Sequence, residues 1–318
     1  MKIRPLASAA ALGLAMFASS AVFVTSVAAA ATFGPLVTPT ELSARLAELD
    51  PIILDIRGEA YADGHLAGAV SAPYGLFRGP QDNPGQLLDV GTLEERYEAL
   101  GLELERPVVI VPEGKTDTDF GAAARVYWTL KSSGFTDLSI LNGGIEAWRA
   151  AELPLESEAV TPSPTELDIT FSEEWTADTE QVAAVTEGEI DALLLDARPD
   201  DFYQGRTSHP AATKPGTLPG AQSHAYTSFF EQGSAAISAI PDTSPLLESL
   251  GVEQGEQIVS FCNTGHWAAT NWFALSEVAG LDNVKLYPGS MVEYSNAGLE
   301  MENTPGLVDN FLNKLRGH

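Results

Sequence analysis

The chain has 318 residues, of which 17 are Lys or Arg and 44 are Asp or Glu, so its formal net charge is −27. A surface of this charge repels nucleic acid and anionic lipid, and we expect neither as a partner. The length is enough for two domains that each bury a core. The single cysteine excludes an intramolecular disulfide. It is either a buried, inert residue or a reactive thiol.

The start of the chain has the composition of a secretory leader. Lys2 and Arg4 are the only charges before Glu41, residues 6–27 are apolar and alanine-rich, and four alanines follow at 28–31. A basic start, an apolar middle and small residues at the end are typical of a cleaved signal peptide. The run is also long enough for a retained membrane anchor, but its small residues favour cleavage. We therefore expect residues 1–30 to be removed, and the protein to be periplasmic or secreted with no membrane contact after cleavage.

Two later stretches of the chain repeat each other. In the first, an apolar run at 51–55 ends in Asp55, Arg57 follows, and Gly-His-Leu-Ala-Gly-Ala occupies 64–69. In the second, an apolar run ends in Asp196, Arg198 follows, and Gly-Thr-Leu-Pro-Gly-Ala occupies 216–221. A short apolar run of this kind predicts a buried strand.

The elements that follow these strands also match. Apolar runs at 107–111 and 257–261 predict a further strand in each half, and each is followed by a helical pattern that stops at a glycine, Gly134 or Gly280. Another strand is expected at 138–141 and at 284–287. The order is the same in both halves, which indicates an internal duplication. Strands that alternate with helices predict an α/β fold with two parallel sheets, each flanked by helices.

The composition also predicts the domain boundaries. We expect an N-terminal domain at 36–152 and a C-terminal domain at 175–308. The stretch at 153–174 is rich in proline, acids and small polar residues and has little periodicity, so it is interpreted as a linker.

The cysteine lies in the most informative segment. Cys262 directly follows the predicted strand at 257–261, and a helix is expected to start within about six residues. Ligands of open α/β sheets bind outside the carboxyl ends of the strands, where this places Cys262. A tight loop containing Gly265 turns backbone N–H groups inward. These dipoles and the helix N-terminus favour a thiolate and attract an anion.

The strand, cysteine, short loop and helix resemble the active-site loop of the rhodanese family. Asp-Ile-Arg at 55–57 with the glycine motif at 64–69 resembles the opening signature of that family, and Leu-Asn-Gly-Gly-Ile-Glu-Ala-Trp at 141–148 resembles its closing signature. The resemblance covers residues 40–300. Within the family, the sequence most resembles the tandem thiosulfate sulfurtransferases, whose first domain is inactive. Pro112 stands at the cysteine position of the first half, which implies that this domain is catalytically inactive.

The resemblance implies a double displacement. The Cys262 thiolate would take the outer sulfur of a small anionic donor such as thiosulfate, form a persulfide, and pass the sulfur to a thiophilic acceptor. No metal or organic cofactor is implied. The residues expected to hold the persulfide and the substrate follow the cysteine in the loop: Asn263, Thr264, Gly265, His266, Trp267 and Ala268.

Some residues depart from the family pattern. Family members often carry an arginine before the glycine of a Tyr/Phe-x-Gly motif, to hold the donor. Here that position is Gln204, and the arginine is Arg206, which becomes the candidate for the donor anion, with Lys214 in reserve. Thr217 replaces the usual histidine. His266 and Trp267 occupy loop positions that are often small or basic, so they would contact the substrate or shape the rim of the pocket.

The same residues admit other interpretations. Asp55 with Arg57, and Asp196 with Arg198, are expected to form buried structural pairs. A Cys-x5-Arg phosphatase needs an arginine at the position of Ala268, which argues against that class. A cysteine protease would need His266 as its base, without a supporting signature. A non-enzymatic sulfur carrier or redox partner remains as the alternative to an enzyme.

The spacing also predicts a different loop length in the first half. Trp128 follows Pro112 by sixteen residues, whereas Trp272 follows Cys262 by ten. If the two tryptophans are equivalent, the loop after Pro112 is about six residues longer than the loop after Cys262.

Overall fold

The computed structural model describes residues 33–306. The predicted signal peptide at 1–30 lies outside the described residues. Within the described part, no helix combines the length and apolar character needed to cross a membrane.

The N-terminal half, within residues 33–306, contains a five-stranded parallel sheet with the order β1-β5-β4-β2-β3. Its strands are β1 (Leu36–Val37), β2 (Ile52–Asp55), β3 (Val70–Ser71), β4 (Val108–Val111) and β5 (Leu138–Leu141). Its helices are α1 (Pro39–Leu49), α2 (Val90–Ala99), α3 (Asp117–Ser132) and α4 (Gly144–Ala150), with short 3-10 turns η1 (Gly58–Asp63) and η2 (Tyr74–Phe77).

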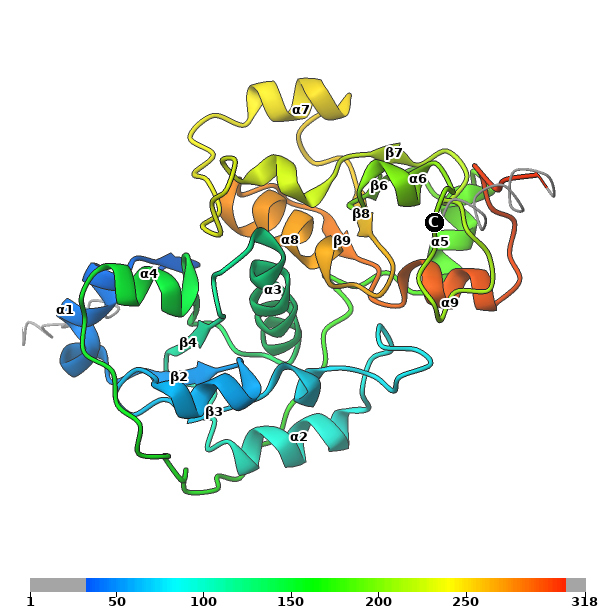
Figure 1. The fold of residues 1–318 in the computed structure, drawn as a ribbon. Coiled ribbons are helices and arrows are strands. Elements are labelled where there is room, and N and C mark those ends of the chain that lie inside the picture. Colours follow the sequence, from blue (N-terminus) through cyan, green and yellow to red (C-terminus); the bar gives the residue numbers. More distant parts are fainter. Residues whose placement is uncertain (1–32, 307–318) are drawn as a thin grey trace, which may run out of the picture. The chain divides into compact units, whose positions relative to one another are not determined.

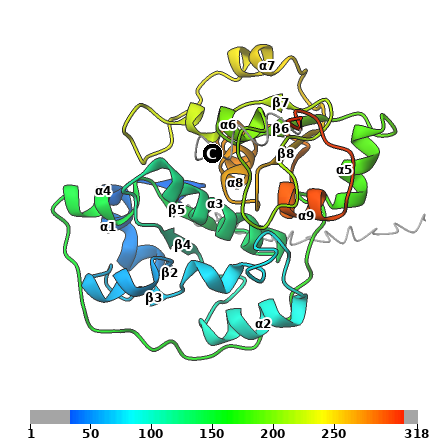
Figure 2. The same cartoon turned by 45° about the vertical axis from the view of Figure 1, so that its right-hand side comes forward.

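Helices cover both faces of this sheet. Residues of β2, β4 and β5 that point to one face pack against α1 and α4, which lie side by side in both views (Figures 1 and 2). Alternate residues of the same strands pack against α2 and α3. This explains why the strands are uninterrupted apolar runs: a parallel sheet with both faces covered buries every side chain.

The C-terminal half repeats this arrangement with a parallel sheet in the order β7-β6-β8-β9. Its strands are β6 (Leu193–Asp196), β7 (Gln222–Ser223), β8 (Ile258–Phe261) and β9 (Val284–Leu286). Its helices are α5 (Thr179–Thr186), α6 (Asp200–Tyr203), α7 (Ser244–Leu250), α8 (Trp267–Phe273) and α9 (Ser290–Asn296), with the 3-10 turn η3 (Tyr226–Phe229) and a π-helical turn η4 (Ala274–Val278). Residues of α5 and α9 pack on one face, and residues of α7 and α8 on the other. The predicted α/β fold with two parallel sheets is confirmed.

Helices α3 and α8 carry the contact between the two halves. Phe273 of α8 meets Phe120 and Tyr127 of α3 edge-on, with ring centroids 5.3 and 5.0 Å apart. Gly121 permits the close approach, because a Cβ atom there would lie 2.9 Å from the carbonyl oxygen of His266. The strand-to-helix loop of the second half therefore faces residues of the first.

The two strand-to-helix loops have the same length, which corrects the expectation of a longer first loop. Five residues separate β4 from α3, and five separate β8 from α8. Helix α3 has 16 residues, whereas α8 has 7 and is continued by the 5 residues of η4, so the first helix is the longer one. The two tryptophans therefore do not mark equivalent positions.

Candidate active site

Cys262 lies where the sequence predicts it, at the carboxyl end of β8. It is the free cysteine of the chain and is 1% exposed. Its carbonyl oxygen accepts from the backbone N–H of Met291 at 3.0 Å, and the carbonyl oxygen of Asn263 accepts from Val292 at 3.0 Å. The start of α9 therefore anchors the first two residues of the loop.

Ser290 fixes the shape of the loop. Its hydroxyl oxygen accepts from the N–H of Cys262 at 3.0 Å and from the N–H of Gly265 at 3.1 Å, and donates to the carbonyl oxygen of Tyr287 at 2.7 Å. Ser290 has a φ of 52°, in the left-handed region that costs a non-glycine residue free energy. Strain of this kind persists where the surroundings hold it, and here three hydrogen bonds do so.

The other backbone N–H groups of the loop, apart from those of Cys262 and Gly265, are open, which means that they have no hydrogen-bond acceptor in the described part of the protein. In the part of the chain that the structure describes, the N–H groups of Asn263, Thr264 and His266 donate to no protein acceptor. Buried N–H groups are normally paired. A group of unpaired N–H donors next to a cysteine can stabilise negative charge on sulfur or on a bound anion.

The expected Asp–Arg pairs are confirmed. Arg57 pairs with Asp55, and Arg198 with Asp196, each with a closest N–O distance of 2.6 Å and with buried side chains. Arg198 also donates to the side-chain oxygen of Asn263 at 3.2 Å, so this structural pair supports the loop. Thr217, which replaces the usual histidine, donates to Asp196 at 2.7 Å.

His266 lies against the first half of the molecule. Its Nε2 is 2.9 Å from the carbonyl oxygen of Thr118, so Nε2 carries the proton, and Nδ1 accepts from the Tyr74 hydroxyl at 3.1 Å. Burial, followed by repulsion from Arg78, lowers the pKa of His266 to about 4. His266 is therefore neutral at pH 7 and donates or accepts hydrogen bonds without a charge.

Trp267 is held from three sides. Its ring stacks on Tyr226 with centroids 5.3 Å apart, and Phe202 meets it edge-on at 5.8 Å. The indole N–H donates to the Thr118 hydroxyl at 2.7 Å. Trp267 therefore has a fixed orientation beside the cysteine.

These residues enclose a small cavity of about 170 Å³ at the cysteine. The lining residues are Thr118, His209, Cys262, Asn263, Thr264, His266 and Trp267. The cavity thus brings together five of the residues that the sequence predicts for the site.

The other predicted site residues lie elsewhere. Gly265 and Ala268 are buried in the loop and in α8. The structure does not bring Arg206 to the lining: it is exposed, its Nε lies 2.7 Å from a carboxylate oxygen of Asp201, and it also pairs with Asp200. Lys214 is exposed as well. A contact between Arg206 and a donor stays a prediction, and it would require Arg206 to leave both carboxylates.

Sequence reasoning missed the residues that the first half contributes. Thr118, Tyr74 and Arg78 all contact the loop. Two weak signals were present: residues 71–81 contain an arginine and no acid, and Arg125 is a lone cation in an apolar helical run. His209, from the second half, was also missed. Burial, followed by Arg78, lowers its pKa.

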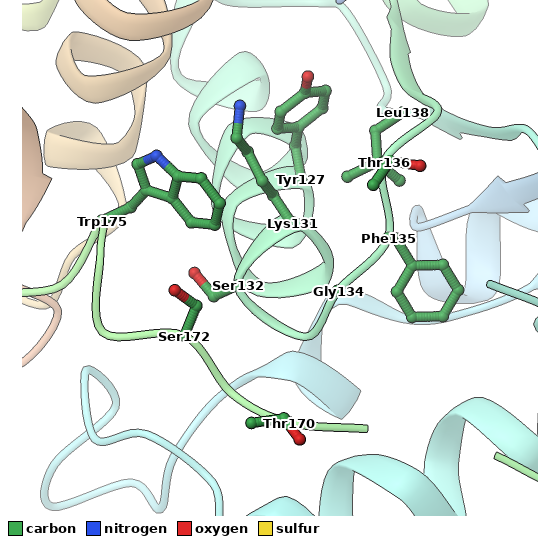
Figure 3. Close-up of a pocket in the computed structure, with 10 residues that line it drawn as sticks. All are labelled: Tyr127, Lys131, Ser132, Gly134, Phe135, Thr136, Leu138, Thr170, Ser172 and Trp175. Atoms are coloured by element: carbon green, nitrogen blue, oxygen red, sulfur yellow. The ribbon is translucent and has the colours of Figure 1, made fainter. Parts of the chain in front are cut away.

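A larger cavity lies away from the cysteine. It has a volume of about 330 Å³ and is lined by the end of α3, the segment after it and the linker (Figure 3). Lys131 lies over the Trp175 ring at 5.0 Å and pairs with Glu277 at 2.8 Å. The ammonium group of Lys131 is therefore already neutralised by an ion pair. The lining contains no nucleophile with an activating base. Among residues 33–306, no group of three or more His, Cys, Asp or Glu side chains is placed to hold a metal ion.

The sequence matches a family model twice. The model of the rhodanese-like domain covers residues 38–151 and 179–297. Together with the two parallel sheets, this shows that the chain belongs to the rhodanese family, as a sulfurtransferase with two such domains in tandem.

Relatives with known names cover most of the chain. A thiosulfate sulfurtransferase from Azotobacter vinelandii is 30% identical over 263 residues, which are 82% of this chain and 94% of the relative. A 3-mercaptopyruvate sulfurtransferase from Escherichia coli K12 is 27% identical over 247 residues, 77% of this chain and 85% of the relative. The two differ in the donor that they are named for.

Solved structures share the fold. The crystal structure of the 3-mercaptopyruvate enzyme SseA from Escherichia coli has a TM-score of 0.67 and 23% identity, and it covers 81% of this chain and 98% of its own. A 3-mercaptopyruvate sulfurtransferase from Leishmania major has a TM-score of 0.70 and 23% identity, and it covers 85% of this chain and 76% of its own.

Proposed function

We propose that this protein moves sulfane sulfur from thiosulfate, or from a similar anionic donor such as 3-mercaptopyruvate, to a thiophilic acceptor through a persulfide on Cys262. One observation carries the proposal: the chain's single cysteine follows a strand end in a loop whose amides at 263, 264 and 266 have no protein acceptor within residues 33–306. The names of the relatives support both donor classes.

The first step forms the persulfide. The Cys262 thiolate attacks the outer sulfur of thiosulfate, a new S–S bond forms to Cys262, and the S–S bond of the donor breaks. Sulfite leaves with the electron pair. The open amides of the loop stabilise the negative charge on the sulfur atoms, because fixed dipoles that already point at the reacting atom need no reorganisation.

The second step releases the sulfur. A thiophilic acceptor such as cyanide attacks the outer sulfur of the persulfide, the S–S bond to Cys262 breaks, and Cys262 leaves as a thiolate. Thiocyanate is the product when cyanide is the acceptor. The enzyme returns to its starting state without an external oxidant or reductant.

The test replaces the nucleophile. In Cys262→Ser, turnover of thiosulfate and cyanide is expected to fall to background, because the sequence has no second cysteine. The wild-type protein incubated with thiosulfate is expected to gain the mass of one sulfur atom, and the variant to gain none. Folding is checked by the thermal unfolding midpoint.

Two outcomes would change the assignment. Turnover that survives in Cys262→Ser would overturn it. Stoichiometric loading of the wild type with no turnover by any acceptor would favour a non-enzymatic sulfur carrier over an enzyme.

A further inference from the structure

Two arginines of the first domain reach the cysteine loop of the second. Arg78, which directly follows η2, donates from Nη2 to the carbonyl oxygen of Thr264 at 2.8 Å. Arg125, in α3, lies with Nη1 3.4 Å from the carbonyl oxygen of Gly265 and donates from Nη2 to that of Gly85 at 3.0 Å. Both guanidinium groups therefore contact the loop that follows Cys262.

Neither arginine has a carboxylate partner in the described part of the chain. Arg57 and Arg198, whose side chains are buried as that of Arg125 is, each pair with an aspartate. Buried charges are normally paired, and acids outnumber bases in this chain 44 to 17. The missing partners are therefore not explained by a shortage of acids.

Hydrogen-bonding capacity is also unused. Arg125 is 1% exposed, and its Nε has no acceptor within residues 33–306; the buried Nη1 of Arg78 has none either. The flat faces of the two groups lie over aromatic rings, Arg78 at 5.3 Å from Tyr74 and Arg125 at 5.0 Å from Trp128. Carbonyl oxygens and rings reduce the cost of burial, but they do not cancel two positive charges.

Neither arginine is among the residues that line the cysteine cavity, but Arg78 donates to Thr264, which is one of them. The cavity therefore lies next to these charges. Burial, followed by repulsion from Arg78, lowers the pKa of Arg125, whereas Cys262 acts in the opposite direction. Burial, followed by repulsion from Arg78, also lowers the pKa of the two histidines that line the cavity, His209 and His266. A Cys262 thiolate balances one of the two positive charges, and a bound anion would balance the other.

We propose that Arg78 and Arg125 of the first domain form the anion site that holds the negatively charged group of the sulfur donor. The ligand class is a small oxyanion that carries a transferable sulfur, either the oxygens of thiosulfate or the carboxylate of a mercapto acid. The identity of the ligand rests on the proposed function. The domain without a cysteine thus takes part in substrate recognition, and the donor is bound between the two domains.

The first experiment measures anion recognition without sulfur transfer. Iodoacetate and iodoacetamide both alkylate a thiolate and release iodide, but only iodoacetate is an anion. The ratio of their second-order rate constants at Cys262 cancels changes in thiolate content and access. Removing one charge-assisted hydrogen bond in Arg78→Gln is expected to lower this ratio roughly ten- to a hundredfold.

The matched variants separate local recognition from net charge. Arg106→Gln removes the same charge from the same domain, at an arginine whose partner is Asp50, and its ratio is expected to equal that of the wild type. Arg78→Lys keeps the charge without the planar group and is expected to retain part of the ratio. Arg125→Gln is expected to act as Arg78→Gln does. Arg125 is deeply buried, and Arg125→Gln can fail to fold. In that case the result for Arg78→Gln alone tests the anion site.

The second experiment identifies the donor. The KM for thiosulfate or for 3-mercaptopyruvate is expected to rise about tenfold or more in Arg78→Gln, and the donor with the larger rise is the one the site recognises. An unchanged alkylation ratio in a folded Arg78→Gln protein would overturn the anion site. A lower ratio with unchanged KM for both donors would overturn its assignment to the donor. If neither donor supports transfer but the ratio falls, the proposed function fails and the anion site stands.

Discussion

The two domains have the same strand-to-helix loop, but they use its backbone amides differently. In the first domain, the carboxylate of Asp119 accepts from the N–H groups of Lys115 and Thr116, both at 2.9 Å. In the second domain, no residue of the described chain takes the amides of Asn263, Thr264 and His266. Lys115 and Thr116 correspond in position to Gly265 and His266, and the Gly265 N–H donates to Ser290. The difference therefore lies at the last residue of the loop: a carboxylate takes the Thr116 amide, and the His266 amide is left for a ligand.

The comparison extends to the helix that follows the last strand of each domain. Gly144 begins α4 with a φ of 60°, and Ser290 begins α9 with a φ of 52°. A Cβ atom on Gly144 would lie 2.4 Å from the carbonyl oxygen of Pro112, so the first domain has no room for a side chain there. The second domain accepts the strain of a serine and gains a hydroxyl that fixes its loop. Duplication therefore preserved the fold, and a few polar groups decide which copy has an open site.

The largest effect is expected at the glycine of the active loop. In Gly265→Ala the new Cβ would lie 2.3 Å from Nη1 of Arg125 and 2.6 Å from the carbonyl oxygen of Pro288, at a φ of +68° that disfavours alanine. The loop must shift, and a shift of about 1 Å in a site can cost on the order of a hundredfold in rate. Steady-state kcat/KM with thiosulfate measures this.

Gly114→Ala is the matched control in the first domain. It introduces a similar clash, 2.0 Å from the carbonyl oxygen of Gly143 at a φ of +80°. It is expected to lower the unfolding midpoint but to leave kcat/KM within about twofold of the wild type. Equal losses of activity in both variants would show that the two loops are not functionally distinct.

A smaller effect is expected at Ser290. Ser290→Ala removes the acceptor for two buried N–H groups, which costs about 1–3 kcal/mol of stability. The loop loses its fixed shape, and we expect kcat to fall about tenfold with a smaller change in KM. Ser290→Thr tests the role of the hydroxyl: it keeps the oxygen and is expected to recover part of kcat if the extra methyl group fits. A change in KM alone would contradict a positioning role.

His266 makes the stability of the protein depend on pH. Thr116, which occupies the same loop position in the first domain, has no titratable group and does not. Burial lowers the pKa of His266 to about 4, so the folded state binds fewer protons than the unfolded state between pH 6.5 and 4. The free energy of unfolding that depends on a neutral His266 is present in full above pH 6.5 and is lost as the pH falls towards 4. Urea unfolding at pH 7 and pH 5 is expected to show that His266→Gln loses about 1–2 kcal/mol less than the wild type. If the wild type and His266→Gln lose the same free energy of unfolding between pH 7 and pH 5, His266 is not the cause of the loss.

The sequence predicts what depends on local pattern and misses what depends on packing between the domains. The apolar runs, the glycine stops and the position of Cys262 lie within short segments, so periodicity identifies them. The Asp–Arg pairs lie two residues apart and were predicted for the same reason. The bond from Arg78 to the loop spans 186 residues and that from Arg125 spans 140, so no local pattern indicates them. They depend on how α3 packs against α8.

The smallest signal is expected from rebuilding the first loop. In a Pro112→Cys, Cys262→Ser protein, thiosulfate is expected to add no sulfur at position 112, although both loops have the same length. The carboxylate of Asp119 occupies the amides of Lys115 and Thr116, so these amides cannot stabilise a thiolate at position 112. Adding Asp119→Ala frees these amides and is expected to produce a small but measurable persulfide fraction by mass spectrometry. The unfolding midpoint controls for the loss of the Asp119 cap. Full loading without Asp119→Ala would show that the occupied amides do not silence the first domain, whereas no loading with it would show that the open amides are not sufficient.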